Sequence, residues 1–319
     1  MIFLIAVILL VFLSAIYHLF MLKVEAKKYK PAGKLFEIDG HKMHITGNGE
    51  GTPVVIMTCG SGAPSAYTEY CNIEPQLSKI TRTCIYERPG YGWSEPASTP
   101  RHTEQIVEDL HRLLEKAQEK PPYILVAHSL GAMEAILYTH KYPEEVAGIV
   151  IIDGTSPYKH INYLESSIPI VFLYLLRVIN NLGLIRIVSE LELIPLLNRR
   201  LSAMPKDIGP VEKAMIYRNI SNKMIIKEGD SLKEVAEKMY KVLSLNDIPL
   251  ILLASDHSMK NLPGWEKSQN NLLELSRHSK LEIINGPNHI SILQEHSTKI
   301  VKEIELIINT IRQEHKSMI

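Results

Sequence analysis

Short and almost continuously apolar segments recur along this chain, and amphipathic helical stretches such as Glu104 to Gln118 separate them. A hairpin pattern around Asp39-Gly40 is followed by "PVVIMTCG" at 53–60, "TCIYE" at 83–87, "YILVA" at 123–127, "AGIVIID" at 147–153, "IPLILLAS" at 248–255 and "KLEIING" at 280–286. Strands that are apolar on both faces have to be covered on both faces, which is the pattern of parallel strands joined by helices. The sequence therefore predicts an α/β protein with a mostly parallel sheet and helices on both faces.

The alternation breaks once, because the interval between Asp153 and Ile248 shows helical patterns and no clear strand. This interval predicts a helical insertion that lies as a lid over the carboxyl edge of the sheet. The expected organisation is a transmembrane anchor at 1–22, a linker at 23–34, a core formed by 35–154 and 246–319, and a helical lid at 155–245.

The run from Ile2 to Leu22 contains no formally charged residue. As a helix it spans roughly the thickness of a bilayer core, so we predict a single-pass membrane helix. The alternative is a signal peptide, because "VEA" at Val24 to Ala26 has the small-x-small form of a cleavage site; the length of the run favours the uncleaved anchor. By the positive-inside tendency, the lysines that follow favour a cytoplasmic position for the downstream domain: Lys23, Lys27, Lys28 and Lys30.

The charge balance and the cysteines narrow the classes of partner. Lysine plus arginine and aspartate plus glutamate number 35 each, so no net field favours nucleic acid. The three cysteines, Cys59, Cys71 and Cys84, lack metal-ligand spacing, and the glycine-rich "GSGAPS" lacks the lysine of a phosphate-binding loop. The sequence therefore predicts no metal and no cofactor.

The stretch "VAHSLG" at 126–131 places Ser129 between a predicted strand and a predicted helix. A strand that passes abruptly into a helix forces the turn residue into a strained conformation and exposes its side chain above the sheet edge. The pattern that builds this turn is Gly-x-Ser-x-Gly, and Ala127 replaces its first glycine. Because alanine adds one methyl group only, we expect the turn to accommodate it.

Three segments together resemble the α/β-hydrolase superfamily, from about residue 35 onward. They are "VAHSLG", "YERPGYGWSEP" at 86–96, and "GPNHISIL" at 286–293. The resemblance implies a serine hydrolase similar to esterase-like, lipase-like or iminopeptidase-like members. It implies Ser129 as the nucleophile and His289, on the loop after the last strand, as its base.

The family places the acid after either of two strands, and both Asp153 and Asp256 satisfy the order serine, aspartate, histidine. The segment "W...Q..L..LS", as in Trp265 to Ser276, is similar to that of members that use the earlier position. Asp153 is therefore favoured, with Asp256 as the alternative.

An acyl-transfer site also needs two backbone N–H donors for the oxyanion. The resemblance implies the N–H of Leu130, directly after the nucleophile, and by position the N–H of Ser61 in "CGSGAPS", which replaces the commoner His-Gly of the family. Cys59 is expected to be a buried thiol rather than a second nucleophile.

These residues predict a membrane-anchored serine hydrolase that cleaves carboxylic esters through an acyl-serine intermediate. An apolar lid and an anchor favour a small-molecule ester or lipid-like substrate with a lipophilic acyl group. Two alternatives stay open: an amide or peptide hydrolase, as in iminopeptidase-like relatives, and a non-catalytic binding protein that keeps the fold.

Overall fold

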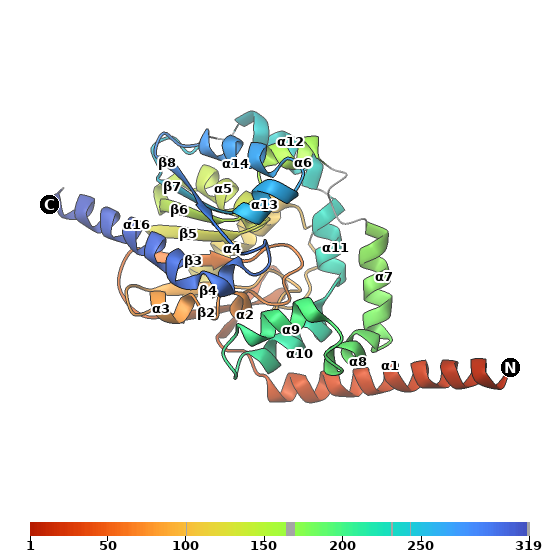
Figure 1. Ribbon diagram of the computed structural model, residues 1–319. Coiled ribbons are helices and arrows are strands. Elements are labelled where there is room, and N and C mark those ends of the chain that lie inside the picture. The colour runs from red at the N-terminus through yellow and green to blue at the C-terminus, as the bar shows by residue number, and fades with distance from the viewer. Residues whose placement is uncertain (100, 164–169, 231, 243, 318–319) are drawn as a thin grey trace.

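The computed structural model describes residues 1–99, 101–163, 170–230, 232–242 and 244–317. It contains an eight-stranded sheet with helices on both faces, as the sequence predicts (Figure 1). The strands are β1 (Lys34–Ile38), β2 (His41–Asn48), β3 (Val54–Thr58), β4 (Thr83–Tyr86), β5 (Tyr123–His128), β6 (Val146–Ile152), β7 (Leu250–Ser255) and β8 (Ser279–Ile284).

The helices before the insertion are α1 (Ile2–Lys28), α2 (Ala66–Glu69), α3 (Glu74–Leu77), α4 (Thr103–Ala117) and α5 (Gly131–Lys141), with a short 3₁₀ helix at Pro143–Glu145. The insertion contains α6 (Pro157–Asn162), α7 (Ile170–Asn181), α8 (Leu184–Glu190), α9 (Pro195–Ser202), α10 (Gly209–Asn219), α11 (Lys223–Asp230) and α12 (Leu232–Val242). The chain continues with α13 (Asp256–Asn261), α14 (Trp265–Leu273), α15 (Ile292–Glu295) and α16 (Ser297–Ser317).

The sheet has the strand order β1-β2-β4-β3-β5-β6-β7-β8. β1 and β2 form the predicted antiparallel hairpin, and β2 pairs antiparallel with β4. All pairs from β4–β3 to β7–β8 are parallel. Parallel strands end at one edge of a sheet, so the loops after β3, β5, β6 and β8 meet there.

Alternate residues of the central strands belong to two separate cores. On β5, Leu125 and Ala127 pack into the core that includes α4 and α5, while Ile124 and Val126 pack into the core that includes α16. Both faces of the strand are therefore buried. This burial explains why the strands read as continuous apolar segments rather than as alternating ones.

The insertion between β6 and β7 is helical, and its described residues contain no strand. The predicted lid range 155–245 includes residues 164–169, 231 and 243, which lie outside the described residues. Helices α9 and α10 lie near α2, and α7 and α8 lie on the side of the molecule where α1 extends (Figure 1).

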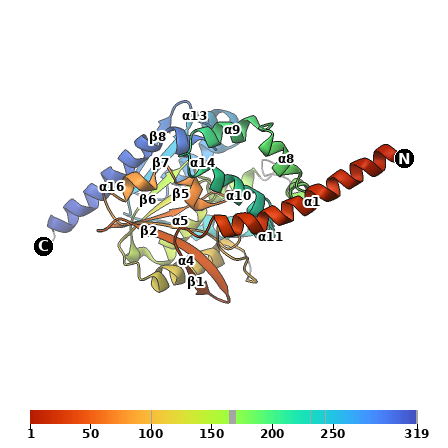
Figure 2. The ribbon, with the colours of Figure 1, turned by 90° about the horizontal axis from the view of Figure 1, so that it is seen from below.

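Helix α1 has a mean hydropathy of 2.7 over its most apolar window, of which 11% is buried. By length and composition it is long and apolar enough to cross a membrane, a property that a signal sequence shares. The helix continues past Leu22 to Lys28, so the beginning of the predicted linker 23–34 is helical. The N-terminal part of α1 projects away from the body in both views (Figures 1 and 2).

Candidate active site

Ser129 lies on the turn between β5 and α5, and its φ of 53° is in the left-handed region. The neighbouring backbones approach this turn closely. A Cβ at Gly131 would lie 2.9 Å from the carbonyl oxygen of Cys59, and a Cβ at Gly60 would lie 2.8 Å from the Cβ of Ser129. Glycine is thus required at 60 and 131, whereas Ala127 is fully buried in the core with its methyl group accommodated.

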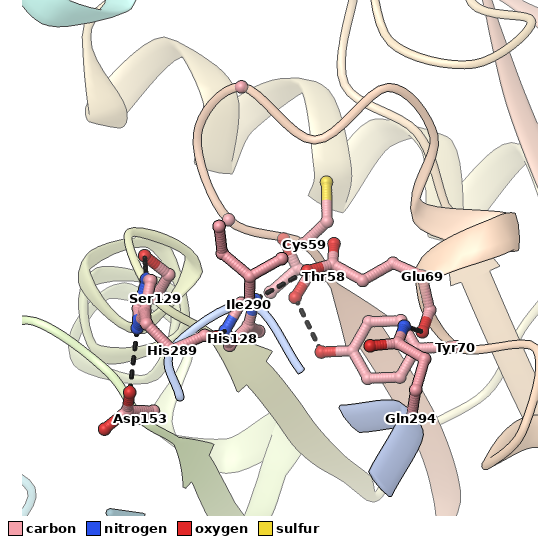
Figure 3. Close-up of polar contacts among 12 residues, drawn as sticks. Thr58, Cys59, Glu69, Tyr70, His128, Ser129, Asp153, His289, Ile290 and Gln294 are labelled. Carbon is pink, nitrogen blue, oxygen red and sulfur yellow. Dashed lines mark hydrogen bonds and ion pairs between the residues drawn. The ribbon is translucent and has the colours of Figure 1, made fainter. Parts of the chain in front are cut away.

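The structure brings Ser129, His289 and Asp153 together in one hydrogen-bonded chain (Figure 3). The Oγ of Ser129 lies 2.9 Å from the Nε2 of His289, and the Nδ1 of His289 lies 2.8 Å from an Oδ2 of Asp153. In this order an imidazole can accept the proton of the hydroxyl while the carboxylate holds the other ring nitrogen protonated. The arrangement can generate an alkoxide nucleophile.

The carboxylate of Asp153 is buried, and four donors satisfy it. Besides His289, it accepts hydrogen bonds from the backbone N–H of Ser255 at 3.0 Å, the hydroxyl of Ser258 at 2.5 Å and the indole N–H of Trp265 at 3.0 Å. Burial opposes ionisation of this group, but the bonds from His289, Ser258 and Ser255 outweigh burial, so the pKa of Asp153 lies below its ordinary value. Asp153 is therefore a carboxylate at neutral pH.

Asp256 occupies a different place, at the first residue of α13. Its carboxylate accepts hydrogen bonds from the backbone N–H of Gly286 and from the Nζ of Lys260, both at 3.0 Å. The side chain joins α13 to the loop after β8. The structure thus places one of the two candidate acids beside His289 and the other outside the hydrogen-bonded chain.

The two expected oxyanion donors lie on different segments, Ser61 on the loop after β3 and Leu130 on the turn between β5 and α5. Within the described part of the chain, neither the Ser61 N–H nor the Leu130 N–H donates a hydrogen bond. The guanidinium of Arg88 donates to the carbonyl oxygens of Cys59 and Gly60, the latter at 3.0 Å, and so holds the loop after β3 in place. Burial raises the pKa of the Cys59 thiol, which keeps this thiol protonated and unreactive.

The buried pair of His128 and Glu69 lies next to the hydrogen-bonded residues Ser129, His289 and Asp153, and no sequence motif predicts it. The Nδ1 of His128 lies 2.5 Å from the carboxylate of Glu69, and its Nε2 lies 3.1 Å from the carbonyl oxygen of His289 (Figure 3). A doubly protonated His128 can donate both bonds. The pair therefore fixes the loop that carries His289, and no local motif relates the two side chains.

Arg88 and Trp265 are two further residues of the site whose roles the motifs did not predict: Arg88 binds the loop after β3, and Trp265 binds Asp153. Arg88 belongs to "YERPGYGWSEP", and Trp265 to the segment noted for its similarity to members that use the earlier aspartate. The indole N–H of Trp265 donates to Asp153, and the side-chain amide of Gln269 donates to the carbonyl oxygen of Gly154 at 2.7 Å. The conspicuous residues of this segment therefore hold Asp153 and the residue that follows it.

We expect Glu69→Gln to destabilise the protein in a pH-dependent way. Burial alone would lower the pKa of His128, but Glu69 outweighs burial and raises it above 6.5; burial alone would raise the pKa of Glu69, but His128 lowers it below 4.5. Both side chains are therefore charged in the folded protein at any pH between the pKa of Glu69 and the pKa of His128. The contribution of this ion pair is lost as the pH rises through the folded-state pKa of His128, and as the pH falls through that of Glu69.

Urea unfolding at about pH 5.5 should show Glu69→Gln less stable than the wild type by about 3–5 kcal/mol, with a smaller gap at about pH 9. The control is Glu234→Gln, which removes an exposed carboxylate from Lys238 and should leave the pH dependence unchanged. A gap that stays constant or widens with rising pH would contradict the assignment of the ion pair.

A pocket of about 370 Å³ opens beside Ser129 and His289. Residues of the loop after β3 form one wall, and the insertion supplies an apolar wall: Ile185, Ile194, Leu196, Leu197, Ile216 and Ile220. The charged groups of the lining are paired, Glu69 with His128 and Arg200 with Glu212 at 2.8 Å. Among the described residues, no group of three or more His, Cys, Asp or Glu side chains could hold a metal ion.

The fold and this arrangement define a class of protein, in which a mostly parallel sheet is covered by helices on both faces and a serine lies on the turn after a central strand. Residues 52–295 match the family model of the α/β hydrolase fold. The chain therefore belongs to the α/β hydrolase family.

Individual relatives agree with this membership. The chain is 25% identical over 300 residues to the uncharacterized protein YbdG of Bacillus subtilis, covering 94% of this chain and 87% of that protein. A crystal structure of a candidate lipase from Acinetobacter baumannii aligns with a TM-score of 0.67 and 16% identity, covering 93% of this chain and 97% of that one. A candidate epoxide hydrolase from Pseudomonas aeruginosa aligns with a TM-score of 0.68 and 12% identity, covering 88% and 96%. Both structures share the fold.

Proposed function

We propose that this protein is a membrane-anchored serine hydrolase that cleaves carboxylic esters with a lipophilic acyl group. Two hydrogen bonds carry the proposal. The Oγ of Ser129 lies 2.9 Å from the Nε2 of His289, and the Nδ1 of His289 lies 2.8 Å from the Oδ2 of Asp153. Ser129 is the nucleophile, His289 the base and Asp153 the acid. The N–H groups of Ser61 and Leu130 form the oxyanion hole.

The reaction proceeds in two balanced halves. Ser129 attacks the ester carbonyl while His289 accepts the hydroxyl proton, and the oxyanion is bound by the two N–H groups. The carbon–oxygen bond of the leaving alcohol breaks, and His289 returns the proton to that alcohol. Water then attacks the acyl-serine with the same base, releases the carboxylic acid and restores Ser129.

The shape and chemistry of the pocket support a lipophilic acyl group. The wall of the pocket that the helical insertion supplies is apolar, and the charged side chains of the lining are already paired with one another. An acyl chain can thus be buried there without the cost of leaving a charge unpaired. The helices α6 to α12 act as a lid over the site in this proposal, and α1 acts as the anchor.

Epoxide hydrolysis is a weaker candidate although a structural neighbour carries that designation. That chemistry normally uses an aspartate at the position where this chain has Ser129. A serine on the turn favours acyl transfer over epoxide opening. Amide hydrolysis uses the same serine chemistry, so ester and amide hydrolysis have to be distinguished by measuring both kinds of substrate.

The test is active-site labelling of the full-length protein in detergent micelles with a fluorophosphonate probe. We expect the adduct to map to Ser129, and Ser129→Ala to stay unlabelled while it keeps the thermal unfolding profile of the wild type. Folded wild type that fails to react, or equal labelling of Ser129→Ala, would support the non-catalytic binding protein instead. A series of acyl esters and matched amides, varied in chain length, then ranks ester against amide hydrolysis.

A further inference from the structure

Helix α1 packs against the insertion over part of the very segment that is long enough to span a bilayer. It contacts α7, α8 and α10. Ser14 and His18 are buried, and a Cβ at Gly183, in the turn between α7 and α8, would lie 2.6 Å from the carbonyl oxygen of Ser14. The turn between α7 and α8 is therefore held against the middle of α1.

The apolar surface of α1 continues past its contact with the insertion. Ile16, Tyr17, Leu19 and Phe20 follow Ser14 and are 49–61% exposed. The uncharged run from Ile2 to Leu22 extends about 32 Å as a helix, and a hydrocarbon core is about 30 Å thick. A bilayer that covers this run includes Ser14, and the turn at Gly183 then lies within the hydrocarbon layer.

The surface that would enter the bilayer is apolar. On α7, exposed side chains lie at the spacing i, i+3, i+4, i+7, which places them on one face of a helix: Val171, Tyr174, Leu175 and Val178, with exposed fractions between 52% and 73%. Leu191 and Leu193, in the segment after α8, are 62% and 64% exposed. Together these six residues form what we call the α7–α8 apolar face.

Charged residues lie at the borders of this face. Glu190, which ends α8, accepts hydrogen bonds from Lys213 and Tyr217, and the exposed Glu192 lies between Leu191 and Leu193. A carboxylate at this position places the segment after α8 at the level of the headgroups.

Arg177 is the one charged residue in the sequence of α7. On α8, the guanidinium of Arg186 is bound by the carboxylate of Glu25 at 2.5 and 2.8 Å, beyond the uncharged run of α1. Helix α7 runs crosswise to α1 on the side where α1 leaves the body, which is the orientation of an interfacial helix beside a spanning one (Figure 1).

We propose that the α7–α8 apolar face is embedded in the lipid bilayer beside α1, and that the segment between α8 and α9 is the portal through which an acyl chain passes from lipid to Ser129. Ile194 and Leu196 line the pocket, and Leu196, in the first turn of α9, is also 48% exposed and lies three residues after the exposed Leu193. One short segment thus contacts both the surrounding medium and the pocket. The portal rests on the proposed hydrolase function, whereas the membrane contact does not.

The membrane contact is tested on the full-length protein in phosphatidylcholine nanodiscs. Single cysteines are introduced as Val171→Cys and Leu191→Cys and labelled with a fluorophore; the native Cys59, Cys71 and Cys84 are buried and are not expected to react. Lipids that carry a nitroxide on the acyl chain should quench both fluorophores several-fold more than a control label at Glu115→Cys on α4. Equal quenching at all three positions would overturn the proposal.

The portal is tested with the double variant Val171→Glu/Leu191→Glu, which alters no residue of the pocket lining. We expect hydrolysis of a short water-soluble ester to be unchanged, and hydrolysis of a long-chain ester dissolved in the same nanodiscs to fall at least tenfold. An equal fall for both esters, or no fall for either, would overturn the portal. If the wild type cleaves neither ester, the proposed function and the portal fail together, and the quenching still decides the membrane contact.

Discussion

Asp153→Asn is expected to lower kcat for ester hydrolysis by about four orders of magnitude with the fold intact. Asp153 accepts the N–H of His289 at 2.8 Å. An asparagine amide at that place can donate a hydrogen bond to Nδ1, which favours the tautomer that carries the ring proton on Nε2. The Nε2 atom then cannot accept the proton of Ser129, so the nucleophile is not activated.

The matched control is Asp256→Asn, because Asp256 was the alternative acid and lies outside the hydrogen-bonded chain. Its loss removes bonds to Lys260 and Gly286 and should leave kcat nearly unchanged. Steady-state hydrolysis of a chromogenic ester, with circular dichroism to verify folding, measures both variants. The opposite ranking would assign the acid to Asp256.

Ser61→Pro is expected to lower kcat by about 10²–10³-fold. The proposed oxyanion donor at this position is a backbone N–H, and proline is the substitution that removes it. The group donates no hydrogen bond within the described residues, so its removal costs no structural bond there. The preceding residue is Gly60, which lacks the Cβ that a following proline would crowd.

Ser61→Ala is the control for the side chain, because it keeps the N–H and removes the hydroxyl only. It should retain nearly wild-type kcat. The loss in Ser61→Pro should appear in kcat rather than in KM, since the oxyanion exists only along the reaction path. Wild-type kcat in Ser61→Pro, or an equal loss in Ser61→Ala, would remove this N–H from the oxyanion hole.

The strand series and the turn at Ser129 could be predicted from the sequence because both depend on local patterns. Each parallel strand is a contiguous apolar segment, since both of its faces are buried. The turn needs only a strand, a helix and small residues at fixed offsets, and Gly131 meets this need. Ala127 departs from the usual glycine, and its buried methyl group shows that the packing there tolerates one added carbon.

The contacts around the candidate site could not be predicted in the same way. Asp153 and Asp256 both follow strands that end at one sheet edge, so chain order alone left the acid open. Glu69 and His128 are 59 residues apart, and no spacing rule pairs them. The close contact of α1 with the turn at Gly183 likewise has no signal in the apolarity of either segment.

By itself the sequence determined the α/β hydrolase fold, the helical insertion, the apolar N-terminal helix and the positions of Ser129 and His289 relative to their strands. Only the tertiary structure decided which aspartate lies beside His289, which pair holds the His289 loop, and where α1 meets the insertion. The physical reason is the separation along the sequence over which each feature is determined. Hydrophobic periodicity and turn geometry depend on residues that are neighbours in the sequence. A hydrogen bond between side chains depends on how distant loops pack at the edge of the sheet.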